Sequence, residues 1–146
     1  MPLENTSTRT SRSRRVRKKY FTHEESNRAI IYISRVVGDI TDVYQFIIDL
    51  RHQLEDAEPG RNADRLELDY ERAMDRLSEL VDELHLAGVE LKDFEKGCVD
   101  FPARLSHREV VLSWCKGEDQ VAHWHEVDED FSCRQPVGLL FASAAL

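Results

Sequence analysis

Cysteine is scarce in this sequence, and the three that occur, Cys98, Cys115 and Cys133, are an odd number. This count argues against a disulfide framework and predicts reduced thiols in a cytoplasmic protein. Long apolar runs are also missing, because no stretch reaches the roughly 18 apolar residues that a membrane-spanning helix needs. The N-terminus has no apolar signal segment, so we expect no membrane partner and no secretion.

Motifs for nucleophilic or phosphate chemistry are absent as well. The chain contains no nucleophile-elbow sequence and no glycine-rich phosphate loop, and scattered cysteines without a motif are typical of packing residues. What is present, 41% hydrophobic and 33% charged residues in a chain of 146, suits one soluble domain. We therefore predict a single α+β domain over residues 20–146.

Positive charge is concentrated at the N-terminus. Residues 1–19 hold seven Lys or Arg and one acid, whereas the rest of the chain holds 13 Lys or Arg and 27 Asp or Glu. Because residues 1–19 offer little to bury, they are predicted to be a disordered basic arm. The arm could bind nucleic acid or another polyanion through residues 9–19, solubilise the chain, or fold back on its own acidic body. The residues that would contact a polyanion are Arg12, Arg14, Arg15, Arg17, Lys18 and Lys19.

Residues 20–88 carry apolar residues at alternating spacings of three and four, which predicts two heptad-patterned helices. The first should begin at the capping box of Thr22 and Glu25 and continue over 22–57. The second should cover 62–87 and end at Gly88. The short connection makes the pair a long antiparallel helical hairpin.

The first helix has a second apolar stripe, formed by Val36, Val43 and Leu50. A continuous helix would be about 50 Å long. That length exceeds what the 58 residues after Gly88 could cover as a compact sheet. The stripe therefore predicts a homodimer in which two hairpins form a coiled-coil-like four-helix bundle.

After Gly88 the apolar period changes to two, which predicts a small antiparallel β-meander of about four strands over residues 89–137. Residues 138–146 form an apolar tail, expected to pack on the sheet or in a subunit interface. The last two strands, 109–115 and 121–126, should be joined by a three-residue loop, because that parity lets Trp114 and Trp124 share the core side. Both histidines of the last strand would then lie on the opposite face.

Several motifs follow one another in the ordered part of the chain: Tyr20-Phe-Thr-His-Glu-Glu-Ser-Asn27, Gly88-Val-Glu-Leu-Lys-Asp93, Gly97 with Val99-Asp-Phe-Pro102, Leu112-Ser-Trp114 with Gly117-Glu118, Trp124-His-Glu126, and Phe131 with Arg134-Gln-Pro136. Over residues 20–137 they resemble the bacterial domain-of-unknown-function family numbered 2203. The resemblance implies kinship and no particular activity. The chain departs from the family at Ser113, where cysteine is frequent, and at Asp130, where glycine is frequent. The first departure argues against thiol chemistry at that position.

His123 and His125 are the strongest candidates for a chemical site. Spaced two residues apart in a strand, they point to one face, which is a common way to present a divalent metal such as zinc, iron or manganese. A third ligand could come from Cys115, which lies diagonal to His123, from Glu129, or from the alternatives Asp100 and Cys98. In the other interpretation both histidines are surface residues that bond to neighbouring carboxylates.

A second polar group could form a charged network of binding residues, namely Asp100, Glu118, Glu126 and Arg134. The network would either fix the turns of the meander or clamp a substrate. Three functions follow from these patterns. The first is a homo-oligomeric binding or interaction module without enzymatic activity. The second is a metal-dependent enzyme that acts on a small molecule through His123 and His125, and the third is a nucleic-acid binder that uses the arm.

Overall fold

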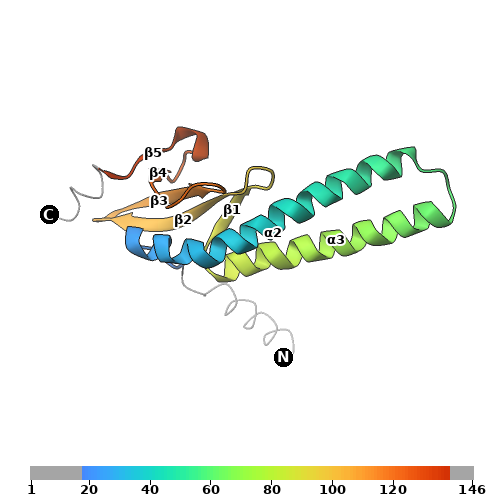
Figure 1. Cartoon of the computed structure of the whole chain (residues 1–146). Helices are drawn as coiled ribbons and strands as arrows, with labels where there is room; N and C mark the ends of the chain where they lie inside the picture. Colours follow the sequence, from blue (N-terminus) through green and yellow to red (C-terminus); the bar gives the residue numbers. More distant parts are fainter. Residues whose placement is uncertain (1–17, 139–146) are drawn as a thin grey trace, which may run out of the picture.

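A helical hairpin followed by a five-stranded antiparallel sheet makes up residues 18–138, which are the residues described by the computed structural model. The elements in chain order are α2 (His23–Asp56), α3 (Arg61–Leu86), β1 (Glu90–Asp93), β2 (Cys98–Leu105), β3 (Arg108–Cys115), β4 (His123–Glu126), the 3-10 helix η1 (Phe131–Cys133) and β5 (Gln135–Pro136). The strands pair in sequence order, each antiparallel to the next. The predicted α+β fold, a hairpin and then a meander, is confirmed (Figure 1).

The helix boundaries follow from their caps. The Thr22 side chain accepts from the Glu25 backbone N–H at 3.0 Å, and the Glu25 carboxylate accepts from the Thr22 backbone N–H at 2.9 Å, so the capping box is confirmed. The 34 residues of α2 form one unbroken helix. At about 1.5 Å per residue the helix is about 50 Å long. Gly88 follows α3 with a φ of 86°, a left-handed conformation that ends the helix at little cost for glycine.

The second apolar stripe of α2 lies mostly inside its own chain. Val36 and Leu50 are 4% and 2% exposed, and Val43 is half-buried. They belong to a core that also includes Leu77 and Leu80 of α3. The predicted dimer surface is therefore wrong at Val36 and Leu50, because these side chains are already buried in the core of one chain.

The sheet packs its apolar face on the N-terminal half of α2, and the rest of the hairpin projects beyond the sheet (Figure 1). The rings of Phe21 and Phe101 meet edge to face at 5.1 Å, and a Cβ on Gly97 would lie 2.8 Å from Val37 of α2. Pro102 is tolerated in the interior strand β2 because β1 pairs only as far as Asp100. Within residues 18–138 no helix has the length and apolar character needed to cross a bilayer.

The meander has five strands, one more than the four expected. The extra strand, β5, pairs Pro136 with His123 and Gln135 with Trp124. A strand of two residues leaves no alternation in the sequence, so hydrophobic periodicity could not predict it. Most of the apolar tail, residues 139–146, lies outside the described residues.

Candidate functional site

The two histidines lie on the sheet face that points away from the helices, as predicted. Val111 pairs with His125 and Ser113 with His123, whereas Leu112 pairs with Trp124 on the core side. Trp114 and Trp124 are 2% and 7% exposed. The expectation that an odd loop parity would place both tryptophans in the core is confirmed, and Cys115 lies on the histidine face. The expected three-residue loop is wrong in length, because residues 116–122 connect β3 and β4.

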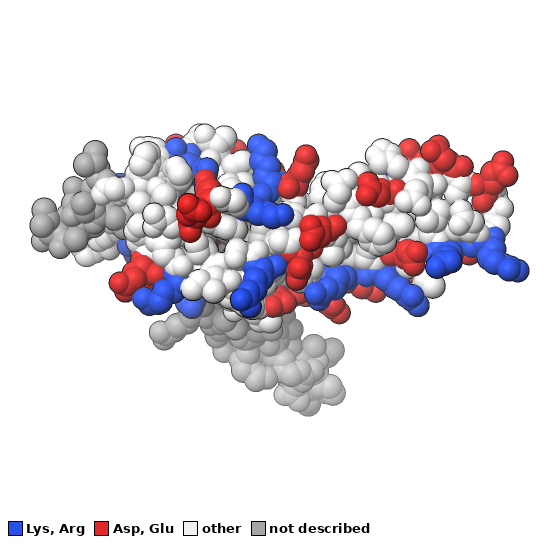
Figure 2. All heavy atoms as spheres, viewed as in Figure 1, with Lys and Arg blue, Asp and Glu red and all other residues white. Residues whose placement is uncertain are grey.

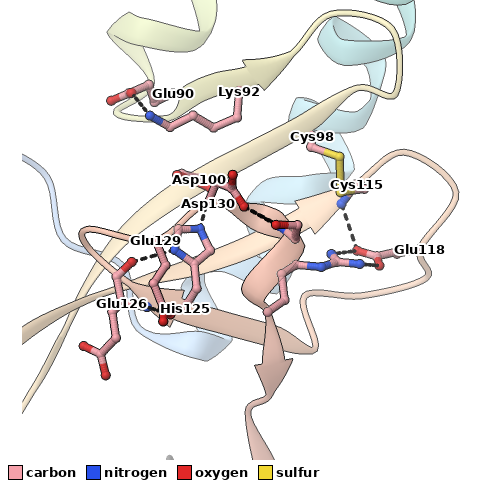
Figure 3. Close-up of polar contacts among 12 residues, drawn as sticks. Glu90, Lys92, Cys98, Asp100, Cys115, Glu118, His125, Glu126, Glu129 and Asp130 are labelled. Carbon is pink, nitrogen blue, oxygen red and sulfur yellow. Dashed lines mark hydrogen bonds and ion pairs between the residues drawn. A yellow bond between two sulfur atoms is a disulfide. The ribbon is translucent and has the colours of Figure 1, made fainter.

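Asp100 and His125 form the buried centre of this face (Figure 3). The His125 Nδ1 lies 2.7 Å from the Glu126 carbonyl oxygen, and a carbonyl can only accept, so Nδ1 carries a hydrogen. The His125 Nε2 lies 3.2 Å from the Asp100 Oδ1. One proton therefore lies between these two atoms, either on an imidazolium facing a carboxylate or on a carboxylic acid facing a neutral ring.

Either arrangement leaves the pair without net charge, which makes its burial tolerable. His125 is 1% exposed and Asp100 is 7% exposed. Desolvation by burial raises the pKa of Asp100, although the charge and the hydrogen bond of His125 oppose this effect. The interpretation that a histidine bonds to a carboxylate is confirmed for His125, but its expected surface position is wrong. Chemically the pair can hold and move one proton, in a place that solvent barely reaches.

Two polar atoms beside this pair are buried and have no hydrogen-bond partner among the described residues. They are the Ser113 hydroxyl and the His123 Nδ1. Ser113 lies directly between Asp100 and His123 in the register of β2, β3 and β4. The nearest carboxylate to His123 Nδ1 is that of Glu118, at 3.9 Å, which is too far for a hydrogen bond.

The predicted charged network separates into distinct pairs. Arg134 donates to both Glu118 carboxylate oxygens at 2.9 and 2.7 Å, and the Cys115 backbone N–H donates to Glu118 at 2.8 Å. Burial opposes ionisation, but the hydrogen bonds from Arg134 and Cys115 outweigh it and hold the pKa of Glu118 below its usual value. Glu126 pairs instead with Arg108, and Asp100 with His125. Two of these pairs join neighbouring or next-neighbouring strands, and the Arg134–Glu118 pair joins the segment before β5 to the loop before β4.

The prediction of reduced thiols is wrong for Cys98 and Cys115, because these two residues form a disulfide with Cα atoms 4.0 Å apart (Figure 3). The two residues are direct partners in the register of β2 and β3. The odd count concealed this pair, since the third cysteine, Cys133, is free and exposed on η1. Cys115 is consequently excluded as a metal ligand in this state, and so is the alternative Cys98.

The remaining metal candidates do not converge. Glu129 accepts from the Glu126 backbone N–H at 3.1 Å, whereas His125 is bonded to Asp100. In residues 18–138 no group of three His, Cys, Asp or Glu side chains is placed to hold a metal ion. The expected zinc, iron or manganese site therefore lacks a third ligand.

The polyanion-binding residues fall almost wholly outside the described part of the chain, which includes only the last two. Lys18 pairs with Glu109, and the Lys19 ammonium lies 4.7 Å from the centre of the Phe21 ring. Both lysines thus already contact the folded body.

Sequence reasoning missed a set of exposed apolar side chains on the hairpin. Those that are at least two-fifths exposed on α2 and α3 are Ile31, Tyr32, Phe46, Leu68, Met74 and Leu86. The sequence contained a signal for this exposure, because these apolar residues lie outside the heptad pattern of each helix. They contrast with the sheet face, where most polar groups bond to one another.

One family model matches residues 19–137, and its description reads "Uncharacterized conserved protein". No curated protein and no solved structure matches the chain. The match covers most of the chain and coincides with the hairpin and the sheet.

Proposed function

The chain belongs to the family DUF2203, and from this premise we propose that it is a homo-oligomeric interaction module whose helical hairpin is the element of assembly. The observation that supports this proposal is the exposure of large apolar side chains on the hairpin. Phe46 is 49% exposed, Leu68 44% and Met74 42%, all on α2 and α3.

The physical reason lies in the number of layers. Two helices that contact only each other bury one stripe apiece, and helical bundles usually gain stability from further helices packed on the remaining faces. The sheet supplies such a layer for the N-terminal half of α2 but not for the projecting part (Figure 1). A second hairpin would supply it there.

The other two functions have less support from the described residues. A metal-dependent enzyme would need a third ligand beside His123 and His125, and the near neighbours of these histidines bond to other groups. A nucleic-acid binder would depend on residues 9–19, which mostly precede the described part of the chain.

Light scattering coupled to size exclusion tests the proposal. At tens of micromolar we expect the mass of a dimer, and Phe46→Arg should shift it to a monomer, because an unpaired charge in place of a buried apolar ring costs several kcal/mol. Val127→Arg is a matched control, since Val127 is 54% exposed and follows β4, away from the hairpin. A wild-type monomer at that concentration would refute the proposal.

A further inference from the structure

The projecting part of α2 carries a row of aspartates. Asp42, Asp49 and Asp56 are exposed and seven residues apart, so they share one line along the helix. Asp42 and Asp49 each follow a buried isoleucine, Ile40 or Ile47, by two residues. Two residues correspond to about 200° of helix rotation, so the row points away from the core.

The facing part of α3 carries a row of arginines. They are Arg61, Arg65, Arg72 and Arg76, all exposed and spaced by four, seven and four residues. The Arg76 guanidinium has one close carboxylate on its own helix, Glu79, at 3.8 Å. Figure 2 shows positive groups interspersed with negative ones along the α3 edge of the projecting hairpin, and negative groups along the α2 edge.

Helix geometry places Phe46 and the arginines on the same side of the hairpin. Phe46 precedes buried Ile47 by one residue, as Arg72 precedes buried Ala73. Viewed from one end, the chain winds in opposite senses in two antiparallel helices. The residue that precedes a buried contact residue on α2 therefore points to the same side of the hairpin as the residue that precedes a buried contact residue on α3. The sheet lies on the other side, because Val37 packs against Gly97 of the loop between β1 and β2. Phe46 follows Val37 by nine residues, which is about 180° of helix rotation, so the two side chains point to opposite sides.

The two rows also match in height. Arg51 of α2 donates to the Tyr70 hydroxyl of α3 at 3.4 Å, and Tyr32 bonds to Glu83, which fixes the levels of the antiparallel pair. These two contacts give the height of each residue along the hairpin. Asp56 then lies at the height of Arg65, Asp49 at that of Arg72, and Asp42 near that of Arg76. Within one chain these partners lie on different helices and point outward.

From this arrangement, and resting on the proposed function, we infer that two hairpins pair through the face away from the sheet, about a two-fold axis parallel to the helices. Such an axis keeps every level and places α2 of one chain against α3 of the other, so each aspartate meets an arginine of the partner and each Phe46 ring packs on α3 of the partner. A two-fold axis across the helices would instead place aspartates against aspartates, which is repulsive. The charge pattern thus selects the arrangement with both hairpin tips at one end.

Charge reversal tests this pairing. Asp49→Arg and Arg72→Asp should each weaken dimerisation at least tenfold in sedimentation equilibrium, because each places like charges together at two symmetric positions. The double variant D49R/R72D should restore the wild-type constant. Circular dichroism checks that each variant keeps its helices, and both sites are exposed in the monomer.

The outcomes separate this inference from the proposed function. A wild-type dimer that withstands both single reversals would overturn the interface and leave assembly through another surface. Single reversals that dissociate the dimer without rescue by the double variant would overturn the pairing of these two residues. A wild-type monomer would remove both the proposed function and the interface.

A cross-link gives a second measurement that needs no charge reversal. Glu58→Cys in a Cys133→Ser background puts one added thiol at the hairpin tip, between α2 and α3. If the two hairpin tips lie at the same end of the dimer, mild oxidation should produce a covalent dimer. Tips at opposite ends would leave the chains uncoupled and would contradict the parallel axis.

Discussion

At the scale of single residues, the Asp100–His125 pair sets the character of the outer sheet face. Each residue alone would be costly to bury, and each removes the cost of the other by sharing one proton. Its position beside the Ser113 hydroxyl gives β2, β3 and β4 one polar row inside the sheet. Such a row disfavours a register slip, since a shift by one residue would carry these groups into the apolar core.

The raised pKa of Asp100 has a consequence for stability. In the folded chain Asp100 holds its proton to a higher pH than its ordinary value of 3.8, so the folded state binds more protons than the unfolded state in that range. The contribution of Asp100 to the free energy of unfolding should therefore be largest below its ordinary pKa and should fall as pH rises through the raised folded value. Urea unfolding of wild type and Asp100→Asn from acid to neutral pH measures this difference. A wild-type advantage that grows with pH would show that His125 outweighs burial and lowers the pKa.

At the scale of elements, the sequence predicted most of the sheet because apolar alternation and loop parity act together. Trp114 and Trp124 had to share the core side, and that requirement placed both histidines on the outer face. The disulfide was missed because its two cysteines lie 17 residues apart and meet only through the register of β2 and β3. The partner of His125, 25 residues away, was equally invisible to spacing.

The Cys98–Cys115 disulfide should stabilise the β2–β3 pair by restricting the unfolded chain. A bridge that closes a loop of 17 residues contributes about 3 kcal/mol in the chain-entropy model. We expect dithiothreitol to lower the free energy of urea unfolding by roughly that amount. The Cys133→Ser variant should show the same loss, since Cys133 is free. Alkylation before reduction should label one thiol, and labelling of three would contradict the bridge.

At the scale of the whole molecule, the sequence predicted the hairpin but not which of its apolar side chains the same chain buries. Seam spacing predicted both helices and their antiparallel order, but it assigned Val36 and Leu50 to a second chain. In the structure both residues are buried in the core of their own chain, and Phe46 is left exposed instead. A one-dimensional pattern shows that a stripe will be covered without showing which layer of the same fold covers it.

Charge is also unevenly distributed over the whole chain, and this distribution determines which segment would attract a polyanion. Residues 1–17 hold five arginines and one glutamate, whereas residues 18–146 hold 15 Lys or Arg and 27 Asp or Glu. Lys18 is paired with Glu109, so it adds little to the charge that a polyanion would meet. Attraction to a polyanion must then come from residues 1–17, because the net negative charge of residues 18–146 repels a polyanion.

Deletion of residues 1–17 should therefore abolish binding to duplex DNA. For the full chain, five arginine contacts at ~0.9 each predict a slope of log K against log salt no steeper than about −4.5. Fluorescence anisotropy with a labelled duplex at several salt concentrations measures both quantities. A full-length control with Arg9, Arg12, Arg14, Arg15 and Arg17 replaced by glutamine keeps the length and removes the charge, so it should match the deletion. Binding that survives the deletion would transfer the site to the body, where Arg61, Arg65, Arg72 and Arg76 of α3 form the exposed cationic row.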